Sequence, residues 1–170
     1  MEEVIIKPLE EISDIEGLRH LYNSSIKGGD FILYDREFSY EEELVWYRKM
    51  IDNILAGNNL VYVAVLNGEI AGICEARKGA GRESRNVSLG VLVRKEHRGK
   101  GIGKALLEYT ISKAKEAFRP KNIWLSVVEA NERALSLYRS LGFNKIAELK
   151  DWYFKDGKYY STFIMAISVE

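Results

Sequence analysis

The chain has 170 residues, of which 46% are hydrophobic and 29% are charged, and its formal net charge is zero. These values predict one globular domain over residues 1–170 and exclude a disordered chain. The zero net charge gives no sign of a nucleic-acid partner, and no apolar run resembles a signal peptide or a membrane span, so we expect a cytoplasmic protein that binds neither nucleic acid nor membrane.

The first half of the chain alternates β-type and helical patterns. Ser39 followed by Glu42 forms a capping box that begins a helix. Asn67-Gly68 between two apolar runs is typical of a β-hairpin turn. The predicted elements, in order, are a strand at 4–9, a helix at about 14–25, a helix at about 40–55, and hairpin strands at 60–66 and 69–77.

The second half continues the alternation. We expect a strand at 86–93, a helix at 101–118, a strand at 123–128, a helix at 132–140, and a final hairpin of strands at 143–150 and 158–167. The strand at 123–128 is almost continuously apolar, which predicts burial on both faces. The whole order predicts an α/β (α+β) fold, a mixed sheet with helices on both faces.

A glycine-rich, basic segment joins the strand at 86–93 to the helix that follows: Arg98-Gly99-Lys100-Gly101-Ile102-Gly103-Lys104. Glycines let a ligand approach the backbone closely, because no Cβ stands in the way. The free N–H groups and the dipole of a helix start favour an anion there. The segment therefore predicts a phosphate or pyrophosphate site.

Two nucleotide-binding patterns fail on spacing. A P-loop ending at Gly103-Lys104 would need glycine where Arg98 stands and Ser or Thr where Ala105 stands. The dinucleotide pattern needs a third glycine where Lys104 or Leu106 stands. A helix entry with surplus glycine is the structural alternative, but three alternate glycines are costly in backbone entropy without a ligand.

The segment resembles the Arg/Gln-x-x-Gly-x-Gly/Ala signature of the GNAT N-acetyltransferases, matched by Arg98, Gly101 and Gly103. A second family pattern, Asn-x-x-Ala-x-x-Leu-Tyr-x-x-x-Gly-Phe, is matched from Asn131 to Phe143. The resemblance covers essentially the whole chain. It implies the GNAT fold, a mostly antiparallel seven-stranded sheet flanked by helices, with central parallel strands that splay apart.

The resemblance also implies an acyl-CoA-dependent N-acetyltransferase, of the EC 2.3.1 class, that moves an acetyl group to a primary amine of a small molecule or a peptide N-terminus. Acetyl-CoA is the implied co-substrate, with no metal. Dimers are common in the family, so a homodimer is an expectation. The residues implied to hold coenzyme A are Val91, Leu92, Val93, Arg98, Gly99, Lys100, Gly101, Ile102, Gly103, Lys104, Asn131, Ala134 and Tyr138.

For the chemistry, the resemblance implies that Tyr138 is the general acid, because the tyrosine of this motif lies near the thioester sulfur. The base is open: family members carry a glutamate where Val91 or Ser126 stands here, which argues against histone and ribosomal-protein substrates. Glu75 and Glu129 are substitute candidates, and a water relay without a dedicated side chain is the alternative. Cys74 lies in an apolar run, so we expect direct attack and no acetyl-cysteine.

The family builds its acceptor pocket from the early helices and the last hairpin, here about 28–40 and 152–160. Both segments are rich in aromatic residues, which can enclose an ammonium or form core and dimer contacts. Asp30, Asp35 and Asp156 are candidates to attract a cation. Because no base is assigned, a second hypothesis is a catalytically weak CoA-binding sensor or interaction module.

Overall fold

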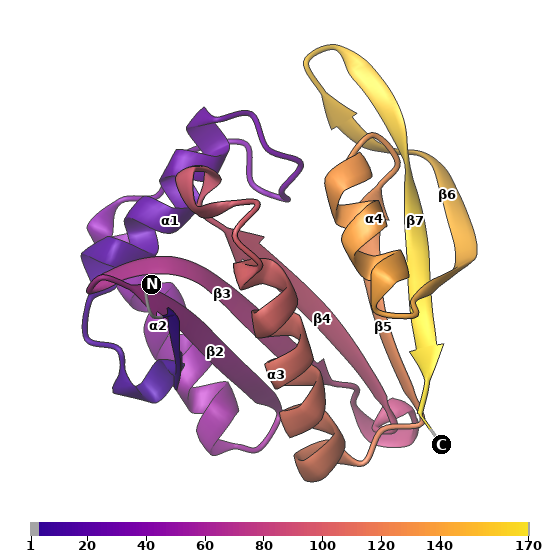
Figure 1. Cartoon of the computed structure of the whole chain (residues 1–170), viewed down its shortest axis with the longest axis horizontal. Helices are drawn as coiled ribbons and strands as arrows, with labels where there is room; N and C mark the ends of the chain where they lie inside the picture. The colour runs from indigo at the N-terminus through magenta and orange to yellow at the C-terminus, as the bar shows by residue number, and fades with distance from the viewer. Residues whose placement is uncertain (1–3, 170) are drawn as a thin grey trace.

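A seven-stranded sheet runs through the molecule in the computed structural model, which describes residues 4–169 (Figure 1). The strand order is β1-β2-β3-β4-β5-β7-β6. Within the described chain, every neighbouring pair is antiparallel except β4 and β5. The predicted fold class is confirmed. The strands are β1 (Val4–Pro8), β2 (Asn59–Leu66), β3 (Glu69–Lys78), β4 (Asn86–Val93), β5 (Asn122–Val128), β6 (Asn144–Lys155) and β7 (Lys158–Ser168).

Four α-helices cover the two faces of the sheet: α1 (Ile15–Lys27), α2 (Tyr40–Leu55), α3 (Ile102–Phe118) and α4 (Glu132–Ser140). Helices α1 and α2 pack on one face through a cluster that includes Leu18, Leu21 and Val63. Helices α3 and α4 contribute to the cluster on the other face, which includes Leu106 and Leu135. Burying one such side chain contributes about 1.5–3 kcal/mol, so these clusters fix which face each helix covers.

Local signals in the sequence produce the element boundaries. The capping box of α2 is complete, because Ser39 accepts from the Glu42 amide and Glu42 accepts from the Ser39 amide. The hairpin turns at Asn67-Gly68 and Asp156-Gly157 each have two residues with positive φ, as type I′ turns require. No helix within residues 4–169 is long and apolar enough to cross a membrane.

Two expectations for the strands are wrong. Strand β5 is not buried on both faces: Trp124 is 37% exposed and Ser126 is exposed too, because α1 and α2 cover β2 and β3 and leave β5 open on their side. Strand β6 continues five residues beyond Lys150. It does so through an irregular stretch around Asp151, whose φ is 52°.

Candidate active site

Strands β4 and β5 diverge after a short parallel start. They pair only at Asn86–Ser88 with Asn122–Trp124. Beyond that point β4 stays paired with β3, and β5 stays paired with β7. The predicted splay is therefore present. We call the diverging stretches, 89–93 of β4 and 125–128 of β5, the fork.

The backbone of β4 presents alternate residues to the fork. The Arg94 amide donates to the Ala71 carbonyl on β3, at 2.9 Å. Because an antiparallel strand directs its polar groups alternately to either side, Leu92 also faces β3, whereas Val91 and Val93 face the fork. The Val93 carbonyl accepts from Arg98 Nε at 2.9 Å, so Val91 is the fork-facing residue whose carbonyl is left to meet a ligand there.

The glycine-rich segment lies at the end of β4, between the 3-10 turn Lys95–His97 and α3. Gly99 and Gly101 have φ of 77° and 80°, and a Cβ at either would meet no described atom within 4 Å. Gly103 is different: its Cβ would stand 3.4 Å from Val93 and 3.5 Å from Leu137, so α3 needs a small residue there to pack. The space in front of Gly99 and Gly101 fits a ligand that approaches the first turn of α3, as a pyrophosphate would.

Arg98 does not direct its charge to this loop. Its guanidinium makes an ion pair with Asp30, with an Nη1–Oδ1 distance of 2.8 Å. Asp30 was a candidate to attract a cation, and Arg98 is the cation that it binds. The loop is thereby tied to the segment after α1. The Arg98 backbone amide donates to the Lys95 carbonyl at 3.3 Å, so the amides that follow it in the loop are the ones that can meet a phosphate.

Tyr138 lies on α4 and is only 7% exposed. Its ring packs against Phe143 with the centroids 6.1 Å apart. Burial, with a smaller electrostatic effect of Cys74 on β3, raises the pKa of the Tyr138 phenol above its ordinary value. Because Cys74 is aligned with Val91 in the sheet register, α4 places this phenol near the strand that borders the fork.

Comparison with known proteins agrees with this geometry. The family model for the acetyltransferase (GNAT) family matches residues 30–143, which include the fork, the glycine-rich loop and Tyr138. The chain belongs to the GNAT acetyltransferase family. GNAT members are acyl-CoA-dependent transferases.

Several relatives share part of the sequence. An N-alpha-acetyltransferase from Sulfurisphaera tokodaii is 30% identical over 103 residues, which cover 54% of this chain and 60% of that protein. The L-amino acid N-acyltransferase MnaT of Escherichia coli is 24% identical over 161 residues, covering 93% and 90%. The match to an N-alpha-acetyltransferase from Saccharolobus solfataricus, 38% identical, covers 42% of each chain.

Solved structures share the fold at low identity. An N-acetyltransferase from Staphylococcus aureus superposes with a TM-score of 0.85 at 18% identity, over 98% of both chains. A GNAT phosphinothricin acetyltransferase from Sinorhizobium meliloti, solved with AcCoA, superposes with a TM-score of 0.81 at 23% identity, over 99% of this chain and 88% of that one. At these identities the likeness shows the GNAT fold.

The two candidate bases of this GNAT chain differ in their surroundings. Glu75 on β3 faces α1 and α2, opposite Gly90 of β4. Its side chain is 15% exposed and accepts from Asn59 at 2.7 Å and from Arg77 at 3.2 Å. Burial raises the pKa of Glu75, and Arg77 opposes this to a smaller extent. A Cβ at Gly90 would meet no described atom within 4 Å, so open space adjoins Glu75 on the fork side.

Glu129 and Asn131, in contrast, brace the backbone. Glu129 follows β5, and its carboxylate accepts from the Ser161 amide of β7 at 2.7 Å. The Asn131 side chain caps α4 by accepting from the Ala134 amide at 3.3 Å. Asn131 is therefore the N-cap of α4, while a contact of Asn131 or Ala134 with pantetheine stays a prediction.

The two aromatic segments expected to form the acceptor pocket do come together. The Phe31 ring contacts Tyr153 and Tyr160, with centroids 6.0 and 5.6 Å apart. The Tyr153 hydroxyl donates to the Ile32 carbonyl at 2.7 Å. The last hairpin is thus docked onto the loop after α1. Asp156 pairs with Lys155, so its charge is already matched.

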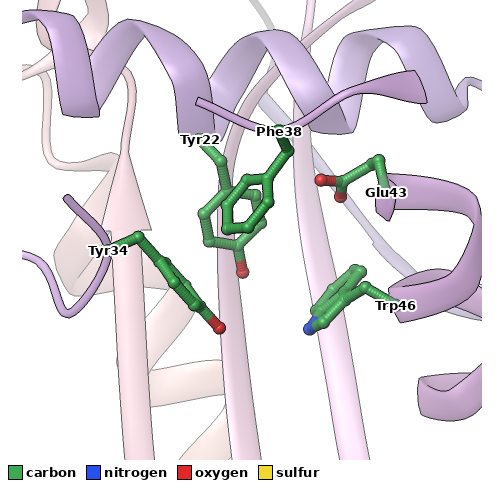
Figure 2. Close-up of a pocket in the computed structure, with 5 residues that line it drawn as sticks. All are labelled: Tyr22, Tyr34, Phe38, Glu43 and Trp46. Carbon is green, nitrogen blue, oxygen red and sulfur yellow. The ribbon is translucent and has the colours of Figure 1, made fainter. Parts of the chain in front are cut away.

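A second group of side chains, near α1 and α2, was not predicted to form a common site. Tyr22, Tyr34, Phe38, Glu43 and Trp46 line one cavity between α1, α2 and the loop that joins them (Figure 2). Tyr34 and Phe38 were among the aromatic candidates. In the sequence, Glu43 and Trp46 have the pattern of ordinary residues of an amphipathic helix. One signal could have identified Glu43: it is a charged residue in the first turn of the helix, on the face where the apolar residues lie.

Proposed function

We propose that this GNAT protein transfers an acetyl group from acetyl-CoA to a primary amine by direct attack while both substrates are bound. The amine belongs to a small molecule or a peptide N-terminus. The names of two relatives, an N-alpha-acetyltransferase and an L-amino acid N-acyltransferase, support an amine acceptor. The observation that carries the proposal is the fork, with open glycines at its end and a buried tyrosine beside it.

The donor side binds through backbone groups. Val91 offers its N–H and C=O to the pantetheine arm, much as a neighbouring strand would. The amides from Gly99 to Lys104 hold the pyrophosphate, assisted by the dipole of α3, whose first turn carries no acidic residue. Acetyl-CoA supplies the thioester that the amine attacks.

Tyr138 stabilises the leaving sulfur. A new N–C bond forms as the C–S bond breaks, and negative charge builds on the sulfur. A phenol with a raised pKa keeps its proton at neutral pH and is ready to donate a hydrogen bond to that charge. Glu75 is the better base candidate, because it adjoins the open space at Gly90 while Glu129 holds β7.

The test is release of coenzyme A from acetyl-CoA across a panel of amines, with Tyr138→Phe compared to wild type. We expect kcat to fall about 10²-fold, with little change in the KM for acetyl-CoA, because one hydrogen-bond donor is lost in the transition state. Tyr109→Phe, on the exposed side of α3, is the matched control.

Full activity in Tyr138→Phe would remove this residue from the mechanism. Tight CoA binding with no turnover on any amine would instead favour the CoA-binding sensor. The proposed location is the cytoplasm and the proposed assembly is a homodimer, which a solution mass measurement tests.

A further inference from the structure

The cavity on the acceptor side has the composition of a cation site. Its walls, the aromatic box, are Tyr22 of α1, Tyr34 and Phe38 of the connecting loop, and Glu43 and Trp46 of α2. Figure 2 shows the Tyr34 and Trp46 rings on opposite sides of one space, with Tyr22, Phe38 and Glu43 around it. Aromatic faces attract ammonium groups through the ring quadrupole.

Glu43 lacks a partner that would explain its burial. It is 2% exposed, and its Oε1 is buried with no hydrogen-bond donor within residues 4–169. Burial raises the pKa of Glu43 to about 7, and the charge of Arg19 lowers it to a lesser extent. A buried carboxylate normally needs a paired cation. A perturbed acid in a cavity is therefore a candidate functional group.

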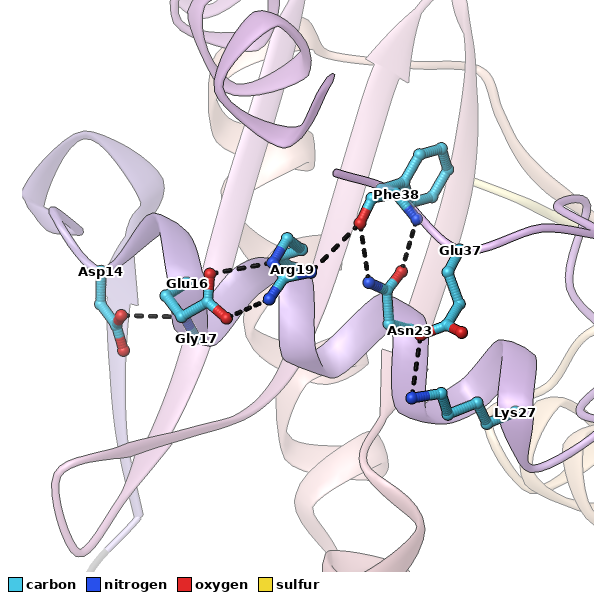
Figure 3. Close-up of polar contacts among 8 residues, drawn as sticks. All are labelled: Asp14, Glu16, Gly17, Arg19, Asn23, Lys27, Glu37 and Phe38. Carbon is cyan, nitrogen blue, oxygen red and sulfur yellow. Dashed lines mark hydrogen bonds and ion pairs between the residues drawn. The ribbon is translucent and has the colours of Figure 1, made fainter. Parts of the chain in front are cut away.

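The nearby arginine is committed elsewhere. Arg19 donates to Glu16 and, at 3.3 Å, to the Phe38 carbonyl, as Figure 3 shows. Asn23 is 5% exposed and clamps the Phe38 backbone with two bonds of 2.9 and 2.8 Å. The loop wall of the aromatic box is thus fixed in place before any ligand arrives, and the charge opposite Glu43 is left for a ligand to supply.

The size of the cavity suits a small cationic head. Its volume is about 30 Å³. Since one water needs roughly 10–15 Å³ of such a cavity, it has room for an –NH₃⁺ head and one methylene. Its open side, where Tyr34 is 40% exposed, leaves a path for the rest of an aliphatic chain.

The location separates this cation from the reacting amine. Helix α2 packs on β2, which is two strands from β4. Neighbouring strands are about 4.8 Å apart, so the strand under α2 lies roughly 10 Å from β4, and the fork lies beyond β4. Between the two, on the same face of the sheet, lies Glu75, which is close enough to Tyr22 to affect the pKa of its phenol.

We propose that the aromatic box binds a primary ammonium group of the acceptor that is not itself acetylated. The acceptor is then an aliphatic diamine or polyamine, whose other amine reaches the fork. This inference rests on the proposed acetyltransferase function, because the expected preference for a diamine is seen in acetyl transfer. The binding of an ammonium group at Glu43 can be measured without acetyl transfer.

The first experiment compares kcat/KM for 1,6-diaminohexane, hexylamine and 6-amino-1-hexanol, the last of which replaces the second ammonium by a neutral hydroxyl. Wild type should prefer the diamine at least tenfold over the amino alcohol. Glu43→Gln and Tyr34→Leu should reduce that preference below threefold. Tyr109→Leu, a tyrosine of similar exposure on α3, should retain it.

Equal kcat/KM for the diamine and the amino alcohol in wild type, or an unchanged preference in Glu43→Gln, would overturn the inference. The second experiment is calorimetric titration of 1,6-diaminohexane into the protein without acetyl-CoA, where we expect at least tenfold weaker binding to Glu43→Gln. If no amine is acetylated but 1,6-diaminohexane still binds more weakly to Glu43→Gln than to wild type, the result contradicts the proposed function and supports the aromatic box. Equal binding to both proteins would overturn the box itself.

Discussion

At the scale of single residues, burial decides the chemical state of the acidic groups. Glu43 of α2 lines the cavity beside α1, Glu75 of β3 faces both helices, and burial raises the pKa of each. Glu42, one residue from Glu43, points outward to Arg36 and the Ser39 amide, and these bonds lower the pKa of Glu42 to about 2. Adjacent residues of one helix turn therefore have opposite electrostatic roles because they lie on opposite faces.

Replacing Glu43 by Gln should change how stability depends on pH. The pKa of Glu43 is about 7 in the folded chain, above its ordinary value of 4.5, so folding favours the protonated form. The stability that this proton contributes is fully present below pH 4.5 and is lost as the pH rises through 7. At 1.36 kcal/mol per pKa unit, the loss is about 3 kcal/mol. Glu43→Gln should remove this loss.

The measurement is the free energy of unfolding in urea from pH 4.5 to 8. Relative to wild type, Glu43→Gln should gain stability progressively over this range, whereas Glu41→Gln, at an exposed position on the same turn, should follow wild type. A constant difference between Glu43→Gln and wild type at all pH values would contradict the assignment.

Replacing the candidate bases should separate their roles. We expect Glu75→Gln to lower kcat/KM about 10²-fold and to flatten its rise with pH, because a base must be deprotonated to accept the proton of the amine. Glu129→Gln should have a much smaller effect on kcat/KM, since its carboxylate braces β7. Initial rates from pH 6 to 9 measure these effects. Equal losses of kcat/KM in Glu75→Gln and Glu129→Gln would contradict the assignment of Glu75 as the base.

At the scale of elements, the start of α3 combines a backbone requirement with the proposed ligand site. Gly101 is the N-cap of α3 in the left-handed region, with φ of 80°. Gly57, after α2, has φ of 72°, and a Cβ there would likewise meet no described atom within 4 Å. The two glycines therefore form a matched pair for substitution.

Gly101→Leu and Gly57→Leu should each lose about 1–2 kcal/mol of stability, because a side chain is strained in the left-handed region. Only Gly101→Leu should also lose CoA binding, by at least a hundredfold in Kd, since its side chain fills the space in front of the loop. Thermal unfolding and calorimetric titration with CoA measure the two effects. Wild-type affinity in Gly101→Leu would defeat the loop assignment.

Elements coded by neighbouring residues could be predicted from the sequence. The capping box at Ser39, the turn at Asn67-Gly68 and the glycine-rich entry to α3 depend on residues a few positions apart, and the structure has each of them. The continuation of β6 past Asp151 could not be predicted. Pairing with β7 is interrupted around this residue of positive φ and resumes at Tyr153, which depends on contacts with another strand.

Features that depend on distant contacts also lay beyond the sequence. The Arg98–Asp30 pair joins residues 68 positions apart, so neither partner could be chosen in advance. The exposure of Trp124 depends on where α1 and α2 end on the sheet, which periodicity does not specify. Glu43 has the pattern of a solvated first-turn glutamate, and only the packing of the four aromatic residues that line the same cavity turns it into a buried acid.

At the scale of the whole molecule, the sheet separates two tasks. The glycine-rich loop, α3 and Tyr138, to which we assign the donor functions, lie on one side. Glu75, the aromatic box and the docked hairpin, to which we assign the acceptor functions, lie on the other. The fork is where β4 and β5 part within the sheet, so it is the place where groups from both faces can meet. This arrangement is what the proposed direct transfer, without a covalent enzyme intermediate, requires. It also fits the burial of Cys74, which raises the pKa of that thiol to about 12.

Hydrogen exchange of backbone amides, with and without saturating coenzyme A, tests the central claim most directly. Free amides at a helix start exchange readily, and a bound pyrophosphate should protect them. We predict slower exchange at Val91 and at residues 99–104, with no change along β2. Unchanged exchange at these amides under saturating coenzyme A, or protection confined to another part of the chain, would contradict the assignment of the fork and its loop as the donor site.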